Sequence, residues 1–257
     1  MTPKQAYDNI SSRARRLLRF HDGLVNTRAR GIRSDWKTAF CKLMHWPRQS
    51  AIDRIDSRDA MIVLRNGSGL SADDFTSDAV DDLLRSSLAV GVSALDRYVH
   101  ERVVRQVVTS LRGSKLRSAP EKLSIPAILA LRMTDELRRA QRAGEGVRPA
   151  NQLRIALQEA LHRRTFQSWR EIEDAFELIG VSGLTASLKT AYGVANLDPI
   201  KEQLDTIVQR RHQIVHESDL VRHQRGGQPR VHPITKKNVH DSLDFFDQFV
   251  NHLEEMS

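Results

Sequence analysis

The sequence predicts an all-α fold built as a bundle of helices, and three observations support this class. Apolar residues recur at three- and four-residue steps through most of the 257 residues, glycine- and proline-rich breaks separate these segments, and no segment has a convincing strand pattern. The clearest break is Asn66–Gly69. We therefore expect a helical N-terminal extension over residues 1–70 and a main helical domain over residues 71–257, with a helical insertion around residues 114–197.

Each expected helix rests on its own pattern. The first runs roughly over Pro3–Leu24, where leucines lie among arginines on a basic amphipathic helix. A long helix is expected over residues 80–113, because valines and leucines recur there at helical spacing. Ser168 begins a shorter helix with the spacing of a capping box, and Thr235 is expected to cap the final helix. Residues 34–65 contain short apolar clusters that do not predict where any secondary-structure element begins or ends.

The most informative helix carries an arginine on its apolar face. Asp198 is expected to be its N-cap, followed by proline at the first helical position. Arg211 lies three and four residues before Ile214 and Val215, so its guanidinium emerges among aliphatic side chains. Because arginine is almost never fully buried without a partner, we expect an anionic group or a second protein surface to meet it. The apolar stripe that Arg211 continues consists of Ile200, Leu204, Ile207 and Val208.

Composition sets the outer limits. The chain has 40 Lys+Arg against 32 Asp+Glu, and this formal charge of +8 favours phosphate-bearing partners without distinguishing RNA from DNA. The single cysteine, Cys41, excludes an intramolecular disulfide, fits a reducing compartment and is expected to be structural. No apolar run approaches the length of a membrane span, and the first residues lack a signal-peptide core. We therefore expect a soluble, cytoplasmic protein.

The segment Arg210–Asp219, which follows a capped helix and precedes one last helix, resembles the HEPN superfamily, specifically its RiboL-PSP-like branch. Leu95–His100 on the long upstream helix adds to the likeness, which covers about Ser71 to the last residue. The resemblance implies a HEPN-like helical bundle with additional helices. Many HEPN domains are metal-independent ribonucleases with an Arg-polar-x3-His motif, and two copies of the motif meet in one dimeric cleft. The matching motif residues are Arg211, His212 and His216, and the supporting residues opposite them are Asp96, Arg97 and His100.

Metal-free RNA cleavage needs the residue types that this motif supplies. His216 suits the transfer of protons from the 2′-hydroxyl and to the departing 5′-oxygen, because imidazole titrates near neutral pH. Arg211 can donate two parallel hydrogen bonds to the phosphate and stays charged, while His212 can position the phosphate or the other histidine. Side chains five residues apart on an ideal helix diverge by about 140°. Arg211 and His216 therefore converge only if the helix ends or a second subunit contributes.

A metal site is an alternative use of the same histidines. His212 and His216 have the four-residue spacing of a helical zinc pair, and Glu217 or Asp219 is near enough in sequence to be a third ligand. Gln213 follows the first histidine, so the glutamate of a His-Glu-x2-His protease is missing.

Two further alternatives concern the arginine and its surroundings. Arg211 can be a structural arginine paired with a buried carboxylate such as Asp96, and the three supporting residues can form an exposed ladder of ion pairs. A second Arg-x4-His pattern, Arg16 to His21, lies on the uniformly basic first helix, where Arg16 is expected to be a solvated surface residue.

The resemblance also implies partners and a role. It implies RNA as the substrate, products with 2′,3′-cyclic phosphate ends, a homodimer, and neither a metal nor another cofactor. It further implies a toxin or an effector in antiviral defence, with an antitoxin or defence-system protein as an additional partner. The leading alternative is a non-catalytic HEPN-like module that binds RNA, a nucleotide or a protein. Arginines in the polar loop after the motif are expected to hold the RNA backbone, although a solvated loop explains them as well: Arg222, Arg225 and Arg230.

Overall fold

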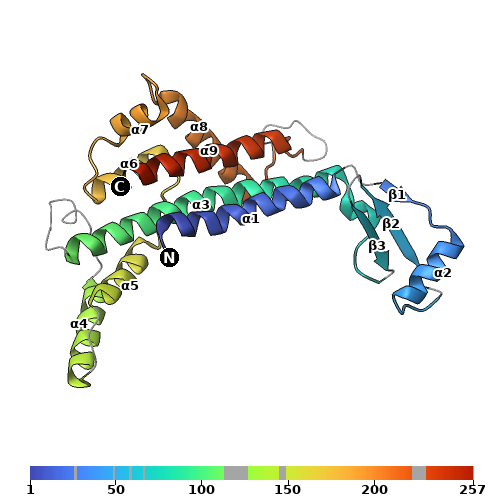
Figure 1. Cartoon of the computed structure of the whole chain (residues 1–257), viewed down its shortest axis with the longest axis horizontal. Helices are drawn as coiled ribbons and strands as arrows, with labels where there is room; N and C mark the ends of the chain where they lie inside the picture. Colours follow the sequence, from blue (N-terminus) through green and yellow to red (C-terminus); the bar gives the residue numbers. More distant parts are fainter. Residues whose placement is uncertain are drawn as a thin grey trace.

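The computed structural model describes residues 1–25, 28–48, 50–57, 60–65, 67–112, 127–144, 149–221 and 230–256. The predicted all-α class is confirmed, because helices make up most of this part of the chain. α1 (Pro3–Leu24), α3 (Ser77–Arg112) and α9 (Lys236–Glu255) are long helices that lie side by side, and α1 begins at the end of the bundle where α9 finishes (Figure 1).

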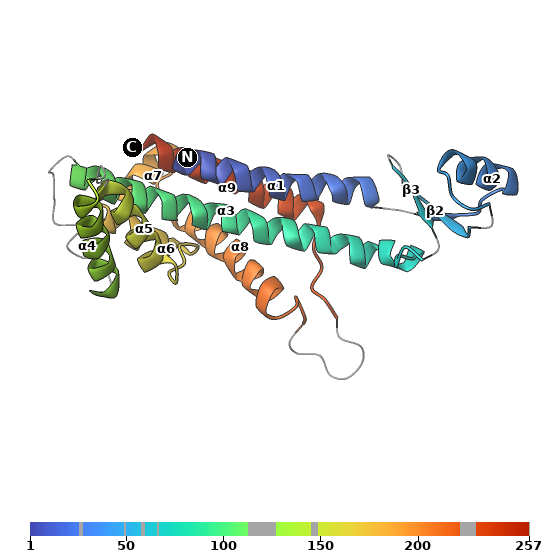
Figure 2. The same cartoon turned by 90° about the horizontal axis from the view of Figure 1, so that it is seen from below.

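α3 is the central helix of the bundle. Val92, Ala94, Leu95 and Tyr98 are all fully buried, although successive positions of a helix point about 100° apart. Burial on several sides requires cover on several sides. α1 packs along α3, and α8 (Asp198–His216) and α9 also pack against it. Figure 2 shows α1 and α8 on different sides of α3.

α9 approaches α3 most closely at a glycine. A Cβ atom at Gly91 would lie 2.5 Å from Cδ2 of Leu243, so a larger residue would require the Leu243 side chain or the helices to shift. Thr235 caps α9 as predicted, because its side chain accepts a hydrogen bond from the backbone nitrogen of Asn238 at 3.2 Å.

Within residues 114–197, the described segments are mainly helical. α4 (Ala127–Arg142) packs on α5 (Pro149–Leu161), and these two helices lie near the end of the bundle where α3 finishes (Figure 1). α6 (Trp169–Leu178) contacts α3 and α8, and α7 (Leu184–Tyr192) contacts α9. The predicted capping box of α6 is present at Ser168. No described helix is both long enough and apolar enough to cross a membrane.

The prediction that the chain contains no strand is wrong for residues 28–65. β1 (Arg28–Arg30), β2 (Ile52–Asp56) and β3 (Met61–Arg65) form an antiparallel sheet in the order β1-β2-β3, accompanied by the short helix α2 (Ser34–Leu43). Apolar runs of four or five residues do not reveal whether they repeat with the period of a strand or of a helix. Pairing between strands, which is a tertiary contact, selects the sheet.

The expected helical extension over residues 1–70 also differs from the structure in its first helix. α1 buries Tyr7, Ala14 and Leu18 and packs along α3, so it belongs to the bundle rather than to a separate extension. Its apolar stripe needs a hydrophobic partner, and α3 supplies one. Residues 67–71 lead through a 3-10 turn, η1 (Ala72–Phe75), into α3.

Candidate active site

α8 presents the motif at its C-terminal end. Its stripe is buried as predicted at Leu204, Ile207 and Val208, and Arg211 lies half-buried one turn further along. The helix begins at Asp198 with Leu197 as N-cap, one residue before the predicted cap. Ile214, beyond the motif arginine, packs against the protein's own hydrophobic core. The apolar face therefore fixes the rotation of α8 and the direction in which Arg211 leaves it.

The guanidinium of Arg211 is incompletely satisfied. Its Nε atom is buried and has no hydrogen-bond partner among the described residues. Asp96 on α3 is close enough for its charge to interact with Arg211, but the two groups form no ion pair within contact distance. The alternative of a structural arginine paired directly with Asp96 therefore lacks its contact. A buried donor without a partner is costly, and an anion bound beside it would remove that cost.

Asp96 and His100 form one small cluster with the backbone that leads into α6. Oδ1 of Asp96 accepts a hydrogen bond from the backbone nitrogen of Phe166 at 2.6 Å, and Oδ2 lies 3.8 Å from Nε2 of His100. Nε2 of His100 also lies 3.0 Å from the carbonyl oxygen of Arg164 and is placed to donate to it. The imidazole packs edge-on against the Phe166 ring, with 4.6 Å between centroids.

Burial shifts the pKa values of Asp96 and His100 in opposite directions. It raises the pKa of Asp96 above its usual 3.8, while the Phe166 N–H and the positive charges nearby, Arg211 among them, oppose the shift. It lowers the pKa of His100 below 6.5, and the neighbouring Asp96 charge opposes that shift.

The lowered pKa of His100 predicts an acid-sensitive fold. Below about pH 6.5 the unfolded chain takes up a proton at this histidine before the folded chain does, so stability is lost as the pH falls toward the folded pKa. The raised pKa of Asp96 acts in the opposite direction at a pH above 3.8, because the folded chain takes up a proton there before the unfolded chain does. We expect His100→Gln to lose less stability than the wild type between pH 7 and pH 5. Urea unfolding at both pH values measures this difference, and equal losses would contradict it.

Arg97, the third expected supporting residue, lies in a different cluster. Its guanidinium pairs with Oε1 of Glu101 at 2.6 Å, and Arg154 from α5 pairs with Oε2 of the same buried carboxylate at 2.8 Å. The structure therefore places Asp96 and His100 together near Arg211, and directs Arg97 toward α5. Asp96, Arg97 and His100 all line one pocket of about 480 Å³. The other residues that line it are Ile10, Ser93, Glu101, Val104, Gln158 and His162.

The two motif histidines lie together on the surface of α8. His212 and His216 are both exposed, and their rings stack with 5.6 Å between centroids and 22° between planes. α8 remains helical to His216, and Glu217 is its C-cap. Helical geometry therefore holds across the motif, and Arg211 and His216 of one chain point about 140° apart. His212 shares a face with His216, not with Arg211.

The turn after the motif is held by an aspartate whose structural role the sequence pattern did not reveal. Asp219 is 1% exposed, and its carboxylate pairs with Arg210 on α8 and with Nε of Arg85 on α3, the latter at 2.8 Å. Its backbone oxygen accepts from the nitrogen of His232 at 2.8 Å, which connects the turn to the segment leading into α9. The end of α8 is therefore fixed to two other parts of the bundle.

This arrangement bears on the zinc alternative. The Asp219 carboxylate forms ion pairs with Arg85 and Arg210, so it does not serve as the third ligand beside the histidines. Within the described ranges, no cluster of three His, Cys, Asp or Glu residues is placed to hold a metal ion.

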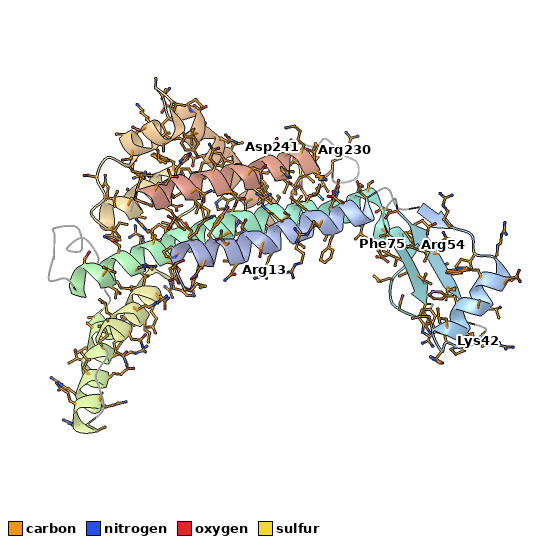
Figure 3. The ribbon with its side chains drawn as sticks, viewed as in Figure 1. Arg13, Lys42, Arg54, Phe75, Arg230 and Asp241 are labelled. Carbon is orange, nitrogen blue, oxygen red and sulfur yellow. The ribbon has the colours of Figure 1, made fainter. Side chains whose placement is uncertain are left out.

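The loop arginines and Cys41 are the other residues that the sequence pattern singled out. Arg222 and Arg225 lie outside the described residues. Arg230 is exposed near the start of α9 (Figure 3), next to an isolated bridge between Leu220 and Val231. Cys41 is a free, fully buried cysteine, as expected of a structural residue.

The second Arg-x4-His pattern does not form a comparable site. Arg16 is exposed on α1, as predicted, whereas His21 is buried with its Nε2 atom 3.2 Å from Oδ1 of Asp81. The sequence spacing is the same as in the motif on α8, but here the histidine is turned into the bundle.

A helical bundle that presents an Arg-polar-x3-His motif at the end of its penultimate helix is the arrangement of a HEPN domain. The model of the family described as RiboL-PSP-HEPN matches residues 55–256, and the chain belongs to this family. Membership makes it a HEPN-type nuclease or binding module in general terms. The searches of curated proteins and of solved structures found no match.

Proposed function

We propose that the protein is a metal-independent endoribonuclease of the HEPN type that leaves 2′,3′-cyclic phosphate ends. The observation that carries this proposal is Arg211, half-buried on α8 with an unpartnered Nε atom. A phosphate beside it would accept the free hydrogen bonds and neutralise the charge. The exposed pair His212 and His216 on the same helix supplies imidazole groups that can accept and donate protons.

The chemistry distributes three tasks over these residues. A neutral imidazole of His216 takes the proton from the 2′-hydroxyl, whose oxygen then attacks the adjacent phosphorus. Arg211 stabilises the additional negative charge on the five-coordinate phosphate. A protonated imidazole gives its proton to the 5′-oxygen as the bond from phosphorus to that oxygen breaks, which leaves a cyclic phosphate and a free 5′-hydroxyl. His212, stacked on His216, orients it.

The site is complete in a symmetric dimer. Within one chain Arg211 and His216 diverge, whereas a two-fold axis near the end of α8 brings both copies of the motif to one phosphate. A second histidine from the partner copy then supplies the acid while the first acts as the base. Val215, which lies between these residues in sequence, is 48% exposed and is available to pack at such an interface.

The test is RNA cleavage in excess EDTA. We expect the purified full chain to cut single-stranded RNA in the chelator and to leave terminal phosphates that resist alkaline phosphatase until acid opens the cyclic ester. Loss of cleavage in EDTA that added zinc or magnesium restores would contradict the metal-independent mechanism. Tight RNA binding with no cleavage under any of these conditions would identify the non-catalytic module instead.

A role as a toxin or antiviral-defence effector, acting on cellular RNA in the cytoplasm and controlled by an antitoxin or defence-system protein, is the biological part of the proposal. It rests on the family resemblance, and it requires the cleavage activity described above.

A further inference from the structure

The unit formed by α2 and the three strands concentrates positive charge. Residues 28–65 contain nine lysines and arginines against four aspartates, a net charge of +5 out of +8 for the whole chain. The family model begins at residue 55, so membership assigns no role to α2, to β1 or to the first part of β2. Figure 3 shows Lys42 and Arg54 on this unit, which lies at the end of the bundle away from α4 and α5. The motif arginine is not part of it.

The unit also leaves its largest aromatic rings partly open. Trp36 and Phe40 stack with 4.9 Å between centroids, and the Trp46 ring meets Phe40 edge-on at 5.8 Å. These rings are half-buried, whereas Cys41 and Ile55 are almost completely buried. Two of the chain's three tryptophans lie in this unit. Tryptophan gains most from burial, so the exposed parts of these half-buried rings leave apolar surface available to a ligand.

The sheet adds a row of cations to these rings. Strand register pairs Arg30 with Arg54 and Ile52 with Arg65, so the three arginines lie on one face of the sheet. The Arg54 guanidinium lies 5.8 Å from the Trp36 ring centroid, and that of Arg65 lies 5.7 Å from the Trp46 centroid. Asp56 holds Arg54 by hydrogen bonds of 2.8 and 2.7 Å.

We propose that this surface, formed by Arg30, Trp36, Trp46, Arg54 and Arg65, binds single-stranded RNA. Unpaired bases stack on open aromatic faces, while neighbouring cations follow the phosphates, and this combination is typical of proteins that hold single strands. A duplex does not offer its base faces. The surface holds a strand of substrate at a place distinct from the motif on α8.

The inference deepens the proposed function, since RNA as the ligand rests on it, but binding here needs no cleavage. A suitable probe is therefore an oligouridylate with 2′-O-methyl groups, which lacks the nucleophile for cleavage. We expect the variant Arg30→Glu/Arg54→Glu/Arg65→Glu to bind it at least tenfold more weakly than the wild type. The slope of log affinity against log salt should fall by about 2, because each phosphate contact on a single strand contributes about 0.7.

The matched control reverses three exposed arginines on α1, as Arg13→Glu/Arg16→Glu/Arg19→Glu. It makes the same change in net charge, and beside these residues α1 carries the single exposed ring of Phe20 instead of a stacked pair with tryptophan (Figure 3 labels Arg13). We expect it to retain most of the affinity and the salt slope. Equal losses in the two variants would show a general charge effect and overturn the inference.

Tryptophan fluorescence gives a second readout in the intact chain. Because Trp169 is only 7% exposed, quenching by the probe should come from Trp36 and Trp46, and it should be largely lost in Trp36→Phe/Trp46→Phe. Absence of quenching in the wild type would overturn the proposal. The proposal would also be overturned if the chain bound anionic phospholipid vesicles in preference to the probe. The exposed side chains of Leu43 and Met44 would then explain the membrane binding. If the charge-reversed variant of the sheet surface cleaves RNA and binds the probe with unchanged affinity, this inference is wrong and the nuclease proposal stands. If the wild type binds the probe in a charge-dependent way but cleaves no RNA, only the nuclease proposal is wrong.

Discussion

Replacing Arg211 by alanine should reduce RNA cleavage by about 100- to 1,000-fold, and replacing His216 by alanine by about 100- to 10,000-fold. The first change removes the charge that stabilises the five-coordinate phosphate, and the second removes the group that transfers protons. Single-turnover cleavage of a defined RNA measures both effects. Thermal stability should change little, because Arg211 has no ion pair to lose among the described carboxylates and His216 is exposed.

The chain contains its own control for this experiment. Arg16→Ala alters the other Arg-x4-His pattern, whose arginine is exposed and whose histidine is buried beside Asp81, so cleavage should stay at the wild-type rate. If the Arg211→Ala and His216→Ala variants both keep wild-type cleavage, the assigned site is wrong.

The His216→Ala variant also tests whether residues of both subunits act on one phosphate. When wild-type and His216→Ala chains are mixed and allowed to exchange, heterodimers should be severely impaired rather than half active, because the acid and the base come from different copies. A chain that sediments as a monomer and cleaves at full specific activity would contradict the shared site.

Replacing Asp219 by alanine should lower the free energy of unfolding by about 3–5 kcal/mol, since it leaves two arginines without their buried partner. Asp219 is 1% exposed between Arg210 and Arg85. Its backbone has a φ of 58°, a left-handed conformation that costs alanine roughly 1–2 kcal/mol and that aspartate tolerates better. Chemical denaturation measures the change.

The contrasting variant is Asp241→Ala. Asp241 is an exposed aspartate on α9 that pairs with Lys237 one turn earlier (Figure 3), and exposed pairs of this kind contribute about 0.3–0.5 kcal/mol. A loss at Asp219 as small as the loss at Asp241 would show that the arginines find water or other partners when the carboxylate is removed. Cleavage should fall with Asp219→Ala as well, because the end of α8 is no longer fixed.

Local patterns in the sequence determined the helices and the position of the motif. Helical spacing over Pro3–Leu24 and residues 80–113 predicted α1 and α3 closely, because an amphipathic or buried helix imposes its period directly on the chain. The caps at Ser168 and Thr235 are likewise local hydrogen bonds. The same periodicity placed Arg211 on an apolar face, and it is half-buried there.

Tertiary contacts decided the rest, because they join residues that no local spacing connects. Asp219 meets Arg85 across 134 positions, and Arg97 turns toward Glu101 and Arg154 instead of joining Asp96 and His100. The strands of residues 28–65 exist only through pairing with one another, and their arginines reach the tryptophans only once the sheet has formed. Burial and pairing over long distances are properties of the folded chain, so only the structure reveals which charges are locked inside it and which stay open to a ligand.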